Sequence, residues 1–267
     1  MKRFPLRPFS ILVMCFGFIP QVAAAQTPTS STTASTPSVD PQAVAVLQQS
    51  VVAMGATVPS DSTATGTITT VAGSLTESGT ITILTRGTNQ SSEQIQTLNG
   101  STVVYSQGQA SNVVGSAVTP LSKELAQTSQ CPDFPLPPLA SALNNPDTAY
   151  KYIGAETLNG SPVQHVQVWN SYASRQEMQM LSAFTLVDIW VSSTSNMPQR
   201  LSYSYRAAGG SEPRIPVDIY YSNYQNVGGA YYPFTIQKSF NGTPSATISL
   251  QNVVLNTGLT DLDFPVQ

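Results

Sequence analysis

The chain has 267 residues, of which 40% are hydrophobic and only 9% are charged. Its 11 basic and 14 acidic residues give a net charge of −3, which argues against nucleic acid or an anionic membrane surface as a partner, because both need a cationic patch. One histidine and two cysteines are too few for a zinc site, and no phosphate-binding or dinucleotide motif is present. We therefore expect neither a metal nor a cofactor.

The N-terminal segment up to Ala25 has the three parts of a secretory signal peptide. Lys2, Arg3 and Arg7 form the positively charged start. Residues 9–19 form an apolar run, shorter than the roughly 20 residues of a membrane-spanning helix, and small residues precede a cleavage site after Ala25. The sequence predicts a periplasmic or secreted protein without a stable membrane anchor. An uncleaved N-terminal anchor is the alternative.

Cleavage after Ala25 would leave 242 residues, enough for one β domain with a substantial core. Residues 26–39 are rich in Ser, Thr and Pro and predict a disordered leader, so the single domain covers residues 40–267. Cys131 is then the one remaining cysteine and can form no internal disulfide. A buried, inert thiol is favoured over a free reactive one. We expect the domain to be monomeric.

A helix is predicted directly after the leader. Asp40 is a suitable N-cap residue, and Pro41 occupies the first helical position. Val44, Leu47, Val51 and Met54 then recur at three- and four-residue spacing on one face, and Gly55 ends the helix. A single apolar stripe of this kind must cover another apolar surface.

After Pro59 the hydrophobic period becomes two, which is typical of half-buried β-strands. The alternation is clearest at residues 81–83, 201–205, 217–221, 234–236 and 248–250. Tight hairpins are predicted at Asn99-Gly100, Asn159-Gly160, Gly228-Gly229 and Asn241-Gly242, with a further reversal at Pro198. Consecutive hairpins predict a meander of about ten antiparallel strands, which twists enough to curl.

Residues 108–147 interrupt this pattern with little strand character. A short helix is expected from Thr119 to Gln127, and four prolines then surround Phe134 and Leu136. This segment is too apolar for a solvated loop, so we predict a helical and proline-rich lid that folds onto the sheet.

His165, the sole histidine, lies in an alternating strand. A hydrogen-bonded structural role is favoured over that of a general base, because no Gly-x-Ser-x-Gly elbow supplies a nucleophilic serine. No local signature makes Cys131 a nucleophile for it either. No catalytic residue is predicted.

Other polar and aromatic groups have weaker functional interpretations. Asp188 and Asp218 are the strand carboxylates that a glycan hydrolase would need as a convergent pair. Asp261 and Asp263 more closely resemble a solvated tail than a calcium site. The tyrosines between residues 203 and 232 favour strand packing, with sugar stacking as the alternative.

The second half of the chain carries a recognisable order of motifs. Asp188-Ile189-Trp190-Val191 leads through Pro198 into Arg200-Leu201-Ser202-Tyr203. Later, the run from Val217 to Tyr224 leads to Val227-Gly228-Gly229 and Tyr232-Pro233-Phe234. This order resembles the bacterial outer-membrane lipoprotein-sorting and lipoprotein carrier proteins of the LolA/LolB-like superfamily. The match covers residues 188–264 by motif and the rest by layout, including the helix at 41–54.

The resemblance implies a curved antiparallel sheet, mainly β with a few helices, that forms a half-open β-barrel. An N-terminal helix and the lid at 108–147 would cover its concave side, and the cavity would bind or carry the acyl chain of a lipid or lipoprotein without catalysis. The interior arginine of lipoprotein carriers has no matching position in this sequence, and Arg86 is a candidate only by its place at a strand end. The predicted cavity-lining residues are Leu47, Val51, Ile81, Ile83, Phe134, Leu136, Leu201, Tyr203, Ile219, Phe234, Ile236, Ile248 and Leu250.

Two other functions remain open from the sequence. The same fold with an interior filled by side chains would serve as a structural or interaction module of the cell envelope. A glycan-directed hydrolase would need His165, Asp188 or Asp218 in a cleft.

Overall fold

The computed structural model describes residues 37–98, 100–122, 126, 133–205 and 215–267. All of the described residues belong to one compact unit. The predicted signal peptide, Cys131 and most of the predicted leader lie outside the described residues. No helix among those described is both long and apolar enough to cross a membrane.

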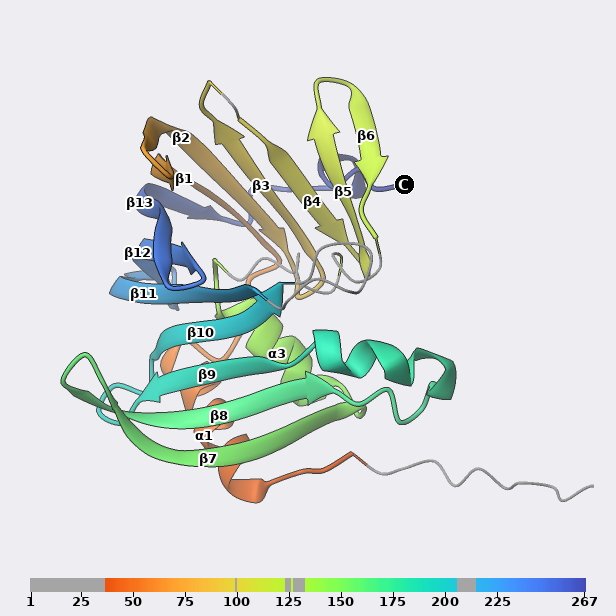
Figure 1. Cartoon of the computed structure of the whole chain (residues 1–267), viewed down its shortest axis with the longest axis vertical. Coiled ribbons are helices and arrows are strands. Elements are labelled where there is room, and N and C mark those ends of the chain that lie inside the picture. The colour runs from red at the N-terminus through yellow and green to blue at the C-terminus, as the bar shows by residue number, and fades with distance from the viewer. Residues whose placement is uncertain (1–36, 99, 123–125, 127–132, 206–214) are drawn as a thin grey trace, which may run out of the picture. The chain divides into compact units, whose positions relative to one another are not determined.

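One antiparallel sheet of thirteen strands dominates the described residues (Figure 1). Its spatial order is β6-β5-β4-β3-β2-β1-β13-β12-β11-β10-β9-β8-β7, so the runs β1–β6 and β7–β13 meet where β1 pairs with β13. β6 and β7 lie at opposite ends of this order, and the curved sheet is a half-open barrel, as predicted. The strands are β1 (Asp61–Ala72), β2 (Leu75–Arg86), β3 (Gln90–Gln96), β4 (Thr102–Ser106), β5 (Gln109–Val114), β6 (Ala117–Pro120), β7 (Thr148–Leu158), β8 (Ser161–Asn170), β9 (Val187–Ser192), β10 (Pro198–Tyr205), β11 (Ile215–Val227), β12 (Ala230–Phe240) and β13 (Thr243–Leu255).

The hairpins follow the turn chemistry of the sequence. Between β7 and β8, Asn159 and Gly160 have φ of 49° and 82°. Between β12 and β13, Asn241 and Gly242 have φ of 50° and 75°. Positive φ at both central residues defines the type I′ turn that matches the twist of the paired strands. Asn99, in the turn between β3 and β4, lies outside the described residues.

Two helices pack against one face of the sheet, here called the inner face. They are α1 (Pro41–Ala53) and α3 (Leu136–Asn144), which contact each other. Asp40 caps α1, since its side chain accepts hydrogen bonds from the backbone N–H of Gln42 at 2.9 Å and of Tyr152 in β7 at 3.0 Å. These bonds lower the pKa of Asp40. The predicted first helix is therefore confirmed, and its cap also ties it to β7.

The structure corrects the sequence-based boundaries in two places. Ser38 and Val39, predicted as part of the leader, pair with Tyr150 at the edge of β7 in a parallel bridge. Residues 109–120, predicted to lack strand character, form β5 and β6, so the sheet has thirteen strands rather than about ten. Of the expected short helix from Thr119 to Gln127, the first two residues belong to β6, and residues 123–125 and 127 lie outside those described.

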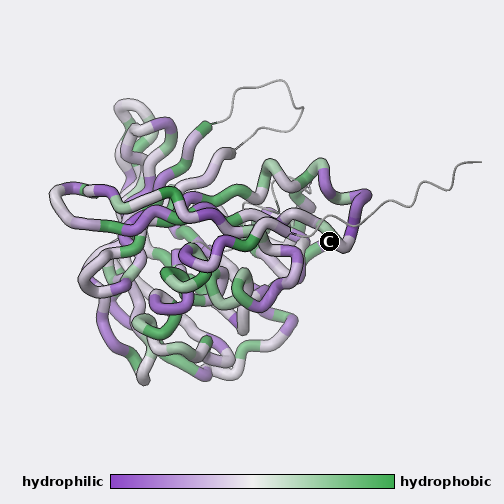
Figure 2. Tube along the Cα trace, turned by 90° about the horizontal axis from the view of Figure 1, so that it is seen from below, coloured by the Kyte–Doolittle hydropathy of each residue, from purple (hydrophilic) through white to green (hydrophobic). Residues whose placement is uncertain are grey.

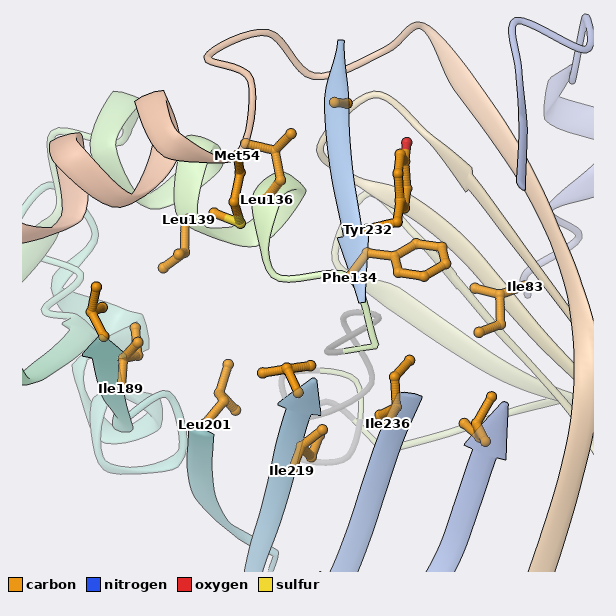
Figure 3. Close-up of a cluster of buried hydrophobic side chains, with 14 of the residues drawn as sticks. Met54, Ile83, Phe134, Leu136, Leu139, Ile189, Leu201, Ile219, Tyr232 and Ile236 are labelled. Atoms are coloured by element: carbon orange, nitrogen blue, oxygen red, sulfur yellow. The ribbon is translucent and has the colours of Figure 1, made fainter. Parts of the chain in front are cut away.

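The main hydrophobic core lies between the inner face and the two helices. Met54, Leu136 and Leu139 from α1 and α3 point toward strand residues such as Ile189 and Ile219 (Figure 3). Hydrophobic and hydrophilic stretches are mixed along the whole trace (Figure 2), as expected where strands bury one side chain in two.

The C-terminal segment packs on the opposite, outer face of the sheet. Phe264 is buried against Leu84 of β2 and Val104 of β4. Asp61 of β1 holds the start of this segment, because its carboxylate accepts hydrogen bonds from Thr257 and Gly258, and these bonds keep its pKa low despite burial. The outer face thus has a small core of its own.

Candidate functional site

The thirteen predicted cavity-lining residues gather on the inner side of the sheet. Eleven are buried in one continuous cluster, and Val51 and Tyr203 are partly buried against it. The alternation that selected the nine strand residues among them therefore identified one face correctly. Many of them pack against each other and so fill the interior there.

The segment before α3 enters this cluster. Phe134 is only 1% exposed and meets Tyr232 of β12 edge-on, with 4.9 Å between ring centroids (Figure 3). Leu136 and Leu139 follow it into the core from α3. The apolar part of the predicted lid thus occupies interior space that an acyl chain would need.

Beside α3, the interior opens into a pocket of about 160 Å³. Leu201 and Tyr203 are the two predicted residues that line it. The remaining walls come from α3, β7 to β9 and the 3₁₀ helix η1 (Gln176–Phe184). They comprise Pro138, Leu139, Ser141, Ala142, Asn145, Thr148, Val168, Trp169, Asn170, Phe184, Thr185, Val187 and Ile189.

The sequence held a signal for some of these missed residues. Val187 and Ile189 alternate with Asp188 and Trp190, which predicts that the first two face the interior. The contribution of η1 could not be foreseen, because nothing in its sequence says where the loop between β8 and β9 folds.

A buried charged cluster lies elsewhere on the inner face. The Nζ atom of Lys238 in β12 is 2.8 Å from a carboxylate oxygen of Glu93 in β3 and 2.8 Å from one of Asp133. Asp133 directly precedes Phe134 and has a fully buried side chain. The cluster therefore joins the segment before α3 to two strands in different halves of the sheet.

Burial and charge set the protonation of this cluster. Burial raises the pKa of Asp133 to about 7, and the negative charge of Glu93 adds to the rise. Burial alone would raise the pKa of Glu93, but the ammonium group of Lys238 outweighs it and lowers that pKa. Burial opposes the charged form of Lys238, yet the two carboxyl groups raise its pKa. The cluster is thus an ammonium ion, a carboxylate and a carboxyl group that titrates near neutral pH.

His165 lies on the outer face, between two carboxylates. Its Nδ1 is 2.7 Å from Oε1 of Glu156, and its Nε2 is 2.7 Å from Oδ1 of Asp188. The ring stacks on Trp190 with 4.2 Å between centroids, and the Trp190 N–H donates to Glu156. Because both ring nitrogens are engaged by carboxylates, this arrangement favours the structural interpretation over a general base.

The two strand carboxylates are each paired with a basic side chain rather than with each other. Asp188 binds His165, whereas Asp218 binds the Arg200 guanidinium at 2.6 Å. Ser202 of β10 pairs with both aspartates, which are therefore two strands apart, roughly 10 Å.

The remaining charged candidates are bound by neighbours in the C-terminal segment. Arg86 pairs with Asp261 at 2.7 Å and is 38% exposed, so it is no interior arginine. Asp263 accepts a hydrogen bond from the backbone N–H of Thr260. No cluster of three metal-binding side chains occurs among the residues that the structure describes.

Comparison with known proteins finds no matching family model and no matching curated protein. Solved structures do match. A LolA superfamily protein from Nitrosomonas europaea is 14% identical, with a TM-score of 0.57 over 84% of this chain and 97% of its own. A domain from Vibrio parahaemolyticus assigned to outer-membrane lipoprotein sorting is 11% identical, with a TM-score of 0.58 over 84% and 96%. A DUF1329 family protein from Desulfovibrio piger is 12% identical, with a TM-score of 0.57 over 84% and 97%.

At these identities the likeness concerns the fold alone. The chain therefore has the LolA-like fold that its sequence motifs predicted.

Proposed function

We propose that this chain is a non-catalytic binding or carrier protein of the cell envelope for the acyl chain of a lipid or lipoprotein. The observation that carries the proposal is the pocket beside α3, which opens from an apolar interior between a half-open barrel and its helices. Ten of its fifteen lining residues are apolar or aromatic, as expected for a lipid site, and the other five are polar: Ser141, Asn145, Thr148, Asn170 and Thr185. The assignment of the Vibrio domain to lipoprotein sorting supports the same function.

The size of the pocket limits what enters without rearrangement. An engineered apolar cavity of about 150 Å³ holds a molecule the size of benzene. The pocket of about 160 Å³ therefore accepts the end of an acyl chain. A longer chain requires Phe134 and α3 to move away from the sheet, because they fill the adjoining interior.

The packing of Phe134 also favours a second candidate, a structural or interaction module whose interior stays filled. The two candidates differ in one measurable property, which is uptake of an apolar ligand.

The test is a fluorescence titration of the delipidated protein with cis-parinaric acid. We expect saturable binding, and we expect the Val187→Phe variant to weaken it, because Val187 lines the pocket. Val254→Phe is the matched control, since Val254 is 45% exposed on β13. Saturable binding that Val187→Phe leaves unchanged would place the site elsewhere. Absence of binding to the wild-type protein would favour the filled module.

The proposed location has its own test. Expressed with its N-terminal segment in a Gram-negative host, the protein should be recovered from the periplasm or medium. N-terminal sequencing should then begin at Gln26. Recovery of the uncleaved chain in the membrane fraction would contradict this prediction.

A further inference from the structure

A second pocket, of about 560 Å³, lies at the end of the sheet where β7 turns into β8 and β9 turns into β10. It shares no lining residue with the pocket beside α3. Four tyrosines contribute to its wall, and none of its eleven lining residues is charged. Its volume is within the range of roughly 300–1,000 Å³ that is usual for small-molecule sites.

The tyrosine rings come from β11 and β12. Tyr220, Tyr221 and Tyr224 belong to β11, and Tyr231 lies opposite Asn226 at the start of β12. The phenol of Tyr224 donates a hydrogen bond to the carbonyl oxygen of Pro198 at 2.9 Å, which fixes its ring against the start of β10. Tyr224 is also partly buried against the main core, so its ring is a fixed part of the pocket wall that loses no further conformational entropy on binding.

Tyr220 is held from the other side. Its ring lies under the Arg200 guanidinium, 5.5 Å from the centroid, and Arg200 also covers Trp190 at 4.2 Å. Asp218 fixes Arg200 through its carboxylate. The His165, Trp190, Arg200 and Tyr220 side chains thus form a stacked row across β8 to β11, and its last member reaches the pocket.

Uncharged hydrogen-bonding groups accompany the rings. Gln199 and Gln237 line the same pocket, together with Ser222 and the turn residue Asn159. Each amide offers both donors and an acceptor. Burying these groups under a purely apolar ligand would leave them unpaired at a cost, and the absence of charge gives no recognition of a phosphate or carboxylate.

We propose that this pocket is a binding site for a neutral saccharide. Pyranose rings present C–H groups that pack on the tyrosine faces, and their hydroxyl groups pair with the glutamine and asparagine amides. The turns at residues 158–159 and 195–197 bound the pocket, which favours a short stretch of sugar rings over an extended peptide. A proline-rich peptide, which also docks on aromatic side chains, is the competing ligand class for the test.

The experiment is isothermal titration calorimetry of the full-length mature protein with cellohexaose, chitohexaose and maltohexaose at millimolar concentration. We expect at least one to bind. Tyr231→Ala should weaken binding about tenfold, whereas Tyr231→Phe should retain most of the affinity because it keeps the ring. Gln237→Ala should also weaken it, and Gln251→Ala on β13 is the matched control, since Gln251 is exposed and outside the pocket.

Chemical-shift mapping by NMR provides a measurement that needs no variant. With the binding sugar added to the wild-type protein, the side-chain amide signals of Gln199 and Gln237 should move. The proposal is overturned if none of the three sugars binds, or if only a proline decamer binds in this pocket. It is also overturned if a sugar binds but Tyr231→Ala does not weaken the binding and the amide signals of Gln199 and Gln237 do not shift. Because Val187→Phe acts on the other pocket, sugar binding should survive that substitution whatever its effect on cis-parinaric acid.

Discussion

The Nζ atom of Lys238, near the C-terminal end of β12, lies 2.8 Å from Oδ1 of Asp133, which directly precedes Phe134. Glu93 of β3 completes the cluster from the other half of the sheet. The Phe134 ring therefore enters the core directly after a residue, Asp133, that is held by an ion pair to Lys238. Three of our predictions concern this segment and its surroundings.

Replacement of Lys238 should destabilise the fold. Lys238→Met removes the cation from the buried carboxyl group of Asp133 and the partly buried one of Glu93, and breaking a buried pair on one side costs about 3 kcal/mol of unfolding free energy. Lys151→Met is the matched control, because Lys151 is exposed on β7 and its loss should change stability by less than about 0.5 kcal/mol. Urea denaturation of both variants near neutral pH measures the difference. Equal effects would show that the cluster contributes no specific stability.

The protonation of Asp133 should make stability depend on pH. The carboxyl group ionises near pH 7 in the folded protein, but at roughly pH 3.9 in an unfolded chain. The folded state thus holds a proton that the unfolded state has released, so the unfolding free energy falls as pH rises from about 4 through about 7. Glu93 acts in the opposite direction, but its lowered pKa confines its effect to more acidic conditions.

Asp133→Asn tests this dependence, because asparagine resembles the protonated acid and cannot titrate. The unfolding free energy of the wild-type protein should drop by about 2 kcal/mol more than that of the variant between about pH 5 and pH 8. All other titratable groups are the same in both proteins, so the comparison isolates the carboxyl group of residue 133. Parallel pH profiles would mean that Asp133 is ionised throughout.

Much of this region follows from local sequence, and some of it does not. The alternation that placed Phe234 and Ile236 on the inner face also places Lys238 there, so this pattern could have indicated a cation on the inner face. It could not name Asp133 as the partner, since that contact joins segments far apart in the chain. The pairing of β1 with β13 could not be predicted from the sequence for the same reason.

The strands β5 and β6 could not be predicted for a different reason. Gln109 to Val114 has no strict alternation, and the sequence therefore predicted an insertion there. Pairing with β4 on one side and β6 on the other supplies the hydrogen bonds of this strand regardless of its weak pattern. The inner-face strand residues were predictable because burial of one side of a strand makes every second residue hydrophobic.

The junction between α1 and the sheet should be sensitive to one added methyl group. Gly55 has a φ of +115°, and a Cβ atom there would lie 2.3 Å from the carbonyl oxygen of Gly229 in the β11–β12 turn. Gly55→Ala should therefore lower the unfolding free energy by more than about 2 kcal/mol. Gly160→Ala is the matched control, with a φ of +82° and no atom within 4 Å. Thermal unfolding should separate the two variants, and similar losses would indicate backbone strain without a clash.

The stacked side chains of His165 and Trp190 on the outer face should lower the pKa of Glu156. A hydrogen bond from the Trp190 indole, followed by one from His165, lowers the pKa of Glu156. Trp190→Phe removes the indole donor and keeps an aromatic ring, so the pKa of Glu156 should rise. Titration of the glutamate carboxyl carbons by NMR measures the change. Trp169→Phe, in the pocket beside α3, should leave this pKa alone. An unshifted pKa in Trp190→Phe would assign the effect to His165.

Removal of the Phe134 ring should lower the unfolding free energy and increase the affinity for an apolar ligand. Phe134→Ala deletes a side chain that is 1% exposed, and the lost packing together with the cavity costs about 3–5 kcal/mol. Phe240→Ala is the matched control, because Phe240 is 46% exposed at the end of β12. If an acyl chain displaces Phe134 on binding, the variant starts with that space empty and should bind cis-parinaric acid several-fold more tightly than the wild-type protein. The titration is run at a temperature where circular dichroism shows the variant to be folded. An unchanged affinity would mean that the ligand occupies only the pocket beside α3 and that Phe134 stays in place.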